Sequence, residues 1–537
     1  MPFVREETER KVASKIVKVL IALLVAAIPA IIAQTLLHIF FKKSFFDFFP
    51  FHDDEMVYWL SSLTYSHVGF QGGYFSIDEV KPPLSFIHYG AHGPLMPMTY
   101  AIIASLWGEW KPYSGVLVNL FLCTSSLLIF IGVTKPGRVQ ILFLSLLLIC
   151  FWPLIVMIPV NMQEGLHLTI GILLAACFFL ILSPARSGQK HVKWVTLILL
   201  SYAACVRPSW SVLYFPAVFL CWPPQGKLSV LIRTFTVFAF IMLAFTVFKV
   251  LGAPYPHQLI YFIKVLTGQA SVNEFIQYAA DNIKRYFATG LDPVGFPQRM
   301  EILFIIVVSS LILLFNCFSR RMCLTAAENK PWLLHITNLA LVVLCTISLY
   351  CIGDYRDFRV WSGPLLLSLL LMIALSGRFA LGIVAAVILA NLFFAPQYLE
   401  FFRGVRSISY NPDRTQIDEF KKAIEGKLVY NKGANPWCNT LLAMNSPFVF
   451  YHMASITPGI GVSDLYYNKD VKLPYQSKYI LLDRNQPIGL ERTENVRVLK
   501  IGDQSQLYAG TEKLANLRQL VDTRIGTLWL NLDANCL

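Results

Sequence analysis

Long apolar runs constrain this chain more than any other feature of its sequence. A bilayer core about 30 Å thick needs about 20 helical residues, because an α-helix rises about 1.5 Å per residue. Segments that come close to this length lie at 15–40, 114–133, 139–158, 165–183, 230–251, 300–319, 332–352, 359–376 and 378–396. Shorter apolar segments lie at 94–108, 193–206 and 208–222. The sequence therefore predicts a polytopic α-helical membrane protein with about nine full spans plus partial-depth helices.

The composition excludes a water-soluble enzyme and a disordered chain. Hydrophobic residues make up 56% of the 537 residues and charged residues only 14%, against about 25% charged residues in soluble proteins. The net charge of +13 is best explained by basic cytoplasmic loops and by contact with anionic membrane lipid. No basic soluble domain with interleaved aromatic residues is visible, so no nucleic acid is expected as a partner.

Basic residues predict which side of the membrane each loop occupies. Lysine and arginine precede the first span and recur in the linkers 134–138, 183–193, 223–233 and 319–330, which places the N-terminus and these linkers in the cytoplasm. They can share one side only if 94–108 does not cross fully and 193–222 is a hairpin of half-helices broken at Arg207-Pro208. The outer loops are then 41–93 and 252–299.

We predict two domains. Residues 1–396 would form the transmembrane catalytic domain, and residues 397–537 a soluble extracytoplasmic α/β domain, because charged residues become frequent there. Within this tail we expect helices at 415–426 and 512–524 and strands at 427–430, 479–482, 496–500 and 527–530. Cys438 and Cys536 could form a disulfide if the tail lies in an oxidising compartment.

Three consecutive acids, Asp53, Asp54 and Glu55, follow the first span and lie between aromatic, membrane-interfacial flanks. Like charges this close raise one another's pKa. A solvated acidic loop would explain them without any function. Acids at the membrane interface instead suggest a general base for a hydroxyl nucleophile or a ligand for a divalent cation at Asp53/Asp54, although no ligand spacing supports a metal.

Cationic residues occur at the same membrane level. Arg207 lies at the predicted break between half-helices, and His92 opens the segment 94–108. Arg356 and Arg359 lie near the start of a later span, where the alternative to a functional role is a local pairing with Asp354 and Asp357. Arginine at membrane depth is rare and usually functional, and its planar fork suits phosphate oxygens.

Glu164 also lies at this level, at the start of the span that begins near residue 165. The alternative to a role in binding is a helix N-terminal charge that the helix dipole favours.

The order of these motifs resembles that of the GT-C superfamily of membrane glycosyltransferases. The sequence is most similar to protein O-mannosyltransferases and lipid A aminoarabinose transferases in its Asp54-Glu55-x-x-Tyr58 pattern, in a proline-led segment ending at Trp107-Gly108, and in Val206-Arg207-Pro208. Two features depart from the family pattern. The basic residue before the proline-led segment is His92, while a literal Lys81-Pro-Pro-Leu lies earlier in the loop. A third acid, Asp53, precedes the Asp54-Glu55 pair.

The resemblance implies a polyprenyl-phosphate sugar donor and an acceptor hydroxyl on a protein, lipid or glycan at the outer face. Asp54 would be the base, with Glu55 and Asp53 beside it. Arg207 would bind the donor phosphate. The remaining expected contacts are His92, Arg356 and Arg359 to the phosphate, and Tyr58, Glu164 and Lys81 to the substrates.

Two other functions stay open. A lipid or solute transporter or flippase of the cell envelope would also carry half-helices and buried arginines, although the sequence shows no repeated halves. A non-enzymatic membrane assembly protein would leave the acid cluster and Arg207 unexplained.

Overall fold

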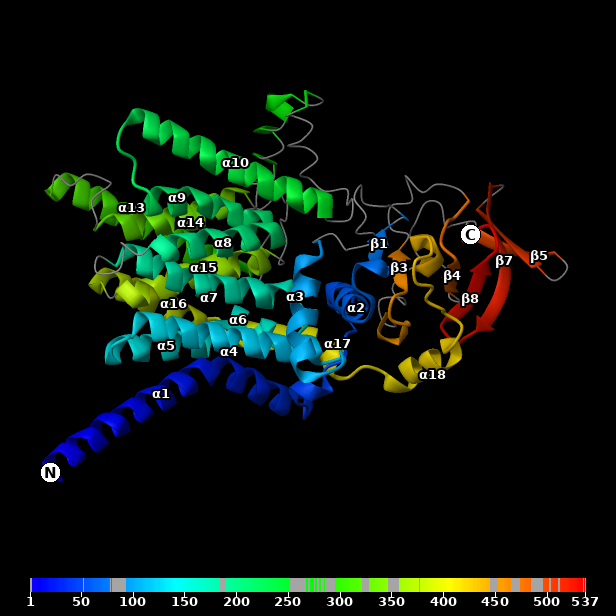
Figure 1. Ribbon diagram of the computed structural model, residues 1–537, viewed down its shortest axis with the longest axis horizontal. Coiled ribbons are helices and arrows are strands. Elements are labelled where there is room, and N and C mark those ends of the chain that lie inside the picture. The colour runs from blue at the N-terminus through cyan, green and yellow to red at the C-terminus, as the bar shows by residue number, and fades with distance from the viewer. Residues whose placement is uncertain are drawn as a thin grey trace.

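In the computed structural model, a bundle of helices lies at one end and a β-sheet domain at the other (Figure 1). The structure describes the chain except for residues 1, 52, 78, 80–92, 184–189, 252–266, 269–270, 275, 278–279, 282–283, 285–294, 321–327, 346–356, 376, 445–452, 465–473, 484–495, 502–503, 510–511, 535 and 537. The N-terminus lies at the far end of the helical part, and the C-terminus lies in the sheet domain (Figure 1).

The helical part follows the apolar runs of the sequence. Its helices are α1 (Pro2–Phe41), α2 (Asp53–Val68), α3 (Leu95–Ala104), α4 (Ser114–Thr134), α5 (Arg138–Cys150), α6 (Trp152–Met157), α7 (Gln163–Leu182), α8 (Lys190–Val206), α9 (Tyr214–Cys221), α10 (Lys227–Leu251), α13 (Gly295–Arg320), α14 (Lys330–Cys345), α15 (Asp357–Leu375), α16 (Arg378–Phe393), α17 (Ala395–Tyr410) and α18 (Arg414–Ile424).

Five of these helices are long and apolar enough to cross a membrane, over Lys15–Phe41, Ser114–Thr134, Gln163–Leu182, Lys227–Phe248 and Gly295–Phe318. A sixth span results if the pair Arg378–Phe393 and Ala395–Ile424, bent by 57°, is one crossing. The other predicted spans are shorter helices in the described part of the chain. The segment 139–158 divides into α5 and α6, because Pro153 cannot donate the hydrogen bond that would continue α5. The chain is thus a multi-pass helical membrane protein.

The expected break in the hairpin 193–222 is confirmed. Helix α8 ends at Val206, Arg207 has extended backbone, and the short 3-10 helix Pro208–Leu213 leads into α9. The segment 94–108 is likewise short, formed by α3 and the 3-10 turn Ser105–Trp107. Each helix in these two segments is shorter than the roughly 20 residues that cross a bilayer.

Helices α7 and α15 pack against each other at the centre of the bundle. Two glycines make this contact close, because a Cβ atom on Gly171 would lie 2.5 Å from the carbonyl oxygen of Gly363, and one on Gly363 would lie 2.9 Å from that of His167. The side chains from Leu365 to Ile373 of α15 are buried. This contact places the N-terminal ends of α7 and α15 next to each other.

The sheet domain has eight strands in the order β1-β3-β2-β4-β8-β7-β6-β5. The strands are β1 (Phe75–Ile77), β2 (Thr440–Met444), β3 (Gly461–Asp464), β4 (Tyr479–Asp483), β5 (Val496–Ile501), β6 (Gln504–Ala509), β7 (Glu512–Asp522) and β8 (Gly526–Asn531). The strands from β1 to β4 pair in parallel, and the remaining pairs are antiparallel.

Most expected elements of the tail are confirmed. Helix α18 and strands β4, β5 and β8 lie where the sequence predicts a helix and three strands. The predicted helix at 512–524 is wrong, because this segment is strand β7, which pairs with β6 on one side and β8 on the other. The predicted strand at 427–430 is also wrong. There the backbone amide of Val429 donates to the Tyr479 hydroxyl instead of to a neighbouring strand.

The first loop contributes to the sheet domain. Strand β1 pairs with β3, and Met56 and Leu60 of α2 share a core with Phe420 and Leu441 of the tail. Cys438 and Cys536 form a disulfide. Helix α2 thus lies between the two parts of the protein, because Tyr58 and Trp59 on the same helix belong to the core of the bundle.

Candidate functional site

Two carboxylates and two guanidinium groups form a continuous chain of ion pairs at the N-terminal ends of α7 and α15. Glu164 Oε1 accepts hydrogen bonds from Arg207 Nη2 at 3.0 Å and from Arg359 Nε at 3.1 Å. Arg359 Nη2 then donates to Asp54 Oδ2 at 2.9 Å. The chain joins four elements that are far apart in sequence: α2, α7, the break after α8, and α15.

Exposure of the side chains rises from Glu164 through Arg359 to Asp54. The side chain of Glu164 is 1% exposed, those of Arg207 and Arg359 are 9% and 19% exposed, and that of Asp54 is 37% exposed. The two positive and two negative charges balance, which offsets the cost of desolvating them. The solvent-accessible end of the cluster is therefore a carboxylate next to a guanidinium.

Arg207 is held by the break that its own segment creates. Pro208 ends α8, so Arg207 is extended and its side chain reaches the start of α7. Its Nη2 donates to Gln163 Oε1 at 3.2 Å as well as to Glu164, and its Nη1 donates to the Arg359 carbonyl at 3.2 Å. The break after α8 thus places the Arg207 guanidinium beside that of Arg359, and both contact Glu164.

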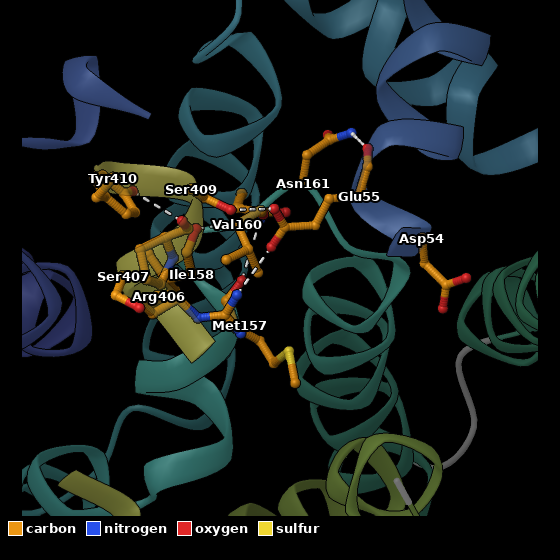
Figure 2. A network of polar contacts seen from close by, with 12 residues as sticks. Asp54, Glu55, Met157, Ile158, Val160, Asn161, Arg406, Ser407, Ser409 and Tyr410 are labelled. Atoms are coloured by element: carbon orange, nitrogen blue, oxygen red, sulfur yellow. Dashed lines mark hydrogen bonds and ion pairs between the residues drawn. The ribbon is translucent and has the colours of Figure 1, made fainter. Parts of the chain in front are cut away.

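Asp54 and Glu55 point in different directions from α2, as Figure 2 shows. Glu55 is buried, and its carboxylate accepts from Arg406 Nη1 at 2.9 Å and from Ser409 Oγ at 2.7 Å, both on α17. Consecutive residues of a helix project about 100° apart, so only one of the two can face Arg359. The structure selects Asp54 for the ion-pair cluster.

Tyr58 lies one helical turn after Asp54 and is buried. Burial, followed by the nearby carboxylates of Asp54 and Glu164, raises the pKa of the Tyr58 phenol well above its ordinary value. The phenol therefore stays neutral at physiological pH. It offers a hydroxyl next to the cluster without adding charge.

The structure brings together five of the residues predicted from the sequence: Asp54, Tyr58, Glu164, Arg207 and Arg359. Arg359 pairs with Asp54 and Glu164, which lie in distant segments of the chain. His92, Lys81, Arg356 and the side chain of Asp53 lie outside the described residues.

The predicted divalent cation at Asp53/Asp54 has no cluster to support it in the described part of the chain. There, no group of three or more His, Cys, Asp or Glu side chains could hold a metal ion. The Asp54 carboxylate contacts a guanidinium instead.

Sequence reasoning missed several neighbours of the cluster. Gln163 adjoins Glu164 and contacts Arg207. His167, one turn further along α7, accepts a hydrogen bond from Trp210 Nε1 at 2.9 Å. On α7, His167 lies three residues after Glu164 and four after Gln163, a spacing that places side chains on the same face of a helix and could have indicated that they lie together. Arg406 has no such signal, because it is one of many cations of the tail and its partner Glu55 lies 351 residues away.

The fold and the site define a multi-pass helical membrane protein with a C-terminal sheet domain and a buried ion-pair cluster where the two parts meet. No protein-family model matches the sequence, and no curated protein matches it.

Three crystal structures of the Archaeoglobus fulgidus oligosaccharyltransferase are similar to the chain, each with a TM-score of 0.47 and 10% identity. They are the apo form, a complex with Zn and sulfate, and a form tethered to an acceptor peptide containing the NVT sequon. The matches cover 86% or 87% of this chain and 68% or 69% of that chain.

Proposed function

We propose that the chain is a membrane glycosyltransferase of the GT-C type. It would move a sugar from a polyprenyl-phosphate donor to an acceptor hydroxyl on the outer face of the membrane. One observation carries the proposal, namely that the Arg359 guanidinium bridges the buried Glu164 and the half-exposed Asp54. The guanidinium that would bind the donor phosphate thus lies next to the Asp54 carboxylate, which would take the proton of the acceptor hydroxyl.

The donor phosphate would bind Arg359 and Arg207. Arg359 uses Nε for Glu164 and Nη2 for Asp54, and its Nη1 has no hydrogen-bond partner among the described residues. A planar guanidinium binds phosphate oxygens through two parallel hydrogen bonds. Glu164 would hold both arginines in place, so that the phosphate meets two oriented cations. His92 and Arg356 are proposed as further phosphate contacts.

Asp54 would act as the general base once the phosphate competes for Arg359. The carboxylate takes the proton of the acceptor hydroxyl while that oxygen attacks the anomeric carbon. The bond from the anomeric carbon to the phosphate oxygen breaks, and the polyprenyl phosphate leaves with the bonding electrons. A single displacement of this kind inverts the configuration at the anomeric carbon.

Tyr58, Glu164 and Lys81 are proposed to contact the substrates, and Glu55 and Asp53 to support Asp54. We further propose that the N-terminus is cytoplasmic and the sheet domain extracytoplasmic, in a cell or inner membrane. The disulfide between Cys438 and Cys536 supports this orientation, because disulfides persist in oxidising compartments outside the cytoplasm.

The test is single-turnover transfer from a polyprenyl-phosphate sugar with purified wild type and Asp54→Asn in liposomes. The substitution keeps the shape of the side chain and removes the proton acceptor. General-base catalysis contributes about 10²- to 10⁴-fold in rate, so transfer should fall by about that factor while donor binding is kept. Full activity of Asp54→Asn would refute the base assignment. A wild type that moves a lipid across the bilayer and forms no glycosidic bond would refute the enzyme.

A further inference from the structure

Glu55 carries a buried charge that takes no direct part in the proposed displacement. Both of its carboxylate oxygens are engaged by α17, with Arg406 Nη1 at 2.9 Å and Ser409 Oγ at 2.7 Å (Figure 2). The Glu55 and Arg406 side chains are 2% and 4% exposed. A buried ion pair contributes little net stability compared with apolar residues of the same size, so stability alone does not account for it.

The same stretch of α17 also contacts the segments on both sides of the site. Tyr410 donates from its hydroxyl to the Pro159 carbonyl at 2.8 Å, in the turn that leads into α7. The Ser409 carbonyl accepts from the Phe49 amide at 2.9 Å, just before α2. Helix α17 therefore connects the start of α2, which carries Asp54, to the start of α7, which carries Glu164.

The turn before α7, which Tyr410 of α17 contacts, is itself bound to α4. Asn119 of α4 donates from Nδ2 to the carbonyls of Met157, Ile158 and Val160. Asn161 in the same turn donates to the Glu55 carbonyl at 3.4 Å. Because the Asn119 amide holds the turn to α4, the Glu164 side of the site is fixed to the bundle, and the placement of α2 decides where Asp54 lies relative to it.

We propose that Glu55, Arg406 and Ser409 are positioning residues for Asp54, an inference that rests on the proposed role of Asp54 as the base. Fixing Glu55 to α17 sets the rotation of α2 about its axis. Because residues 54 and 55 project about 100° apart, this rotation directs Asp54 towards Arg359. A catalytic group must be placed to within about 0.5 Å and 10–20°. The single ion pair between Arg359 and the partly exposed Asp54 does not fix the carboxylate that closely.

A double-mutant cycle on the full-length protein tests the inference. Glu55→Gln should lower the single-turnover transfer rate by about 10- to 100-fold, since a misplacement of about 1 Å can cost about 10²-fold. Donor binding should stay within about twofold. In the Asp54→Asn background the same substitution should cause less than about twofold further loss, because Glu55 acts through Asp54. Two losses that multiply would overturn the inference.

Two variants separate positioning from folding. Ser409→Ala removes one hydrogen bond and keeps the buried charge pair, so it should fold and lower the rate by about 3- to 10-fold, again only when Asp54 is present. An unchanged rate in Ser409→Ala and Glu55→Gln would also overturn the inference. Glu79→Gln is the matched control. Glu79 is a buried carboxylate that ties the first loop to the tail through the amides of Gln476 and Ser477, and its loss should not change the rate.

The cycle distinguishes this inference from the proposed function. If Asp54→Asn keeps full activity, the base assignment fails. If Asp54→Asn is impaired and the two losses multiply, the base assignment stands and only the positioning role fails.

Discussion

Replacing Arg359 tests the centre of the cluster most directly. Arg359→Ala removes a guanidinium that donates to Glu164 at 3.1 Å and to Asp54 at 2.9 Å. A hydrogen bond to a charged group contributes about 1.5–3 kcal/mol, and each 1.4 kcal/mol is about a factor of ten in affinity. If Arg359 binds the donor phosphate, Arg359→Ala should weaken donor affinity by about 10- to 150-fold.

The fold should tolerate this change. Glu164 keeps Arg207 as a partner at 3.0 Å, so no uncompensated buried carboxylate is left. We expect the unfolding temperature to fall by less than about 5 °C. Arg359→Lys keeps the charge and loses the planar fork, so it should recover only part of the lost affinity. Arg207→Ala should weaken donor binding by about 10- to 100-fold for the same reason.

The assay is equilibrium binding of a polyprenyl phosphate to detergent-solubilised protein, with thermal unfolding of each variant measured in parallel. At saturating donor, Arg359→Ala should retain much more transfer activity than Asp54→Asn, because it keeps the base. Wild-type affinity in both Arg359→Ala and Arg359→Lys would refute the phosphate assignment. A large loss of unfolding temperature without a change in affinity would show that the cluster is purely structural.

Two further predictions concern packing and pH. Gly171→Ala should lower both the unfolding temperature and the transfer rate, because its Cβ atom would lie 2.5 Å from the Gly363 carbonyl oxygen and would push α7 and α15 apart. Gly382→Ala, which has open space around it, is the control and should be neutral; equal effects of the two would contradict this account. Burial raises the pKa of Glu79 above its ordinary value of 4.5, so its stabilising effect is largest below that value and is lost as pH rises through the folded-state pKa. The unfolding temperature of wild type relative to Glu79→Gln should therefore fall from about pH 4 to about pH 7, and a constant difference would contradict the shift.

Local sequence signals predicted the features that depend on near neighbours in the chain. The apolar runs predicted nine spans, and five of them correspond to described helices that are long and apolar enough to cross a membrane. This much follows from sequence because the length needed to cross a bilayer can be counted directly. Proline predicted the break after Val206, because it cannot donate to the preceding turn. The apolar, β-branched and aromatic residues of 479–482 and 527–530 predicted two strands, and the structure pairs these strands with each other. Each of these inferences uses only residues that are contiguous in the sequence.

Tertiary structure alone decided which residues meet. Arg359 pairs with Glu164 and, across 305 positions, with Asp54, because the packing of α7 against α15 brings its guanidinium next to these distant segments. Segment 512–522 has helix-forming residues and is a strand, because pairing on both edges satisfies its backbone. Asp54 and Glu55 are adjacent acids with different partners, because a helix directs consecutive side chains to different neighbours and those neighbours lie hundreds of residues away in the chain.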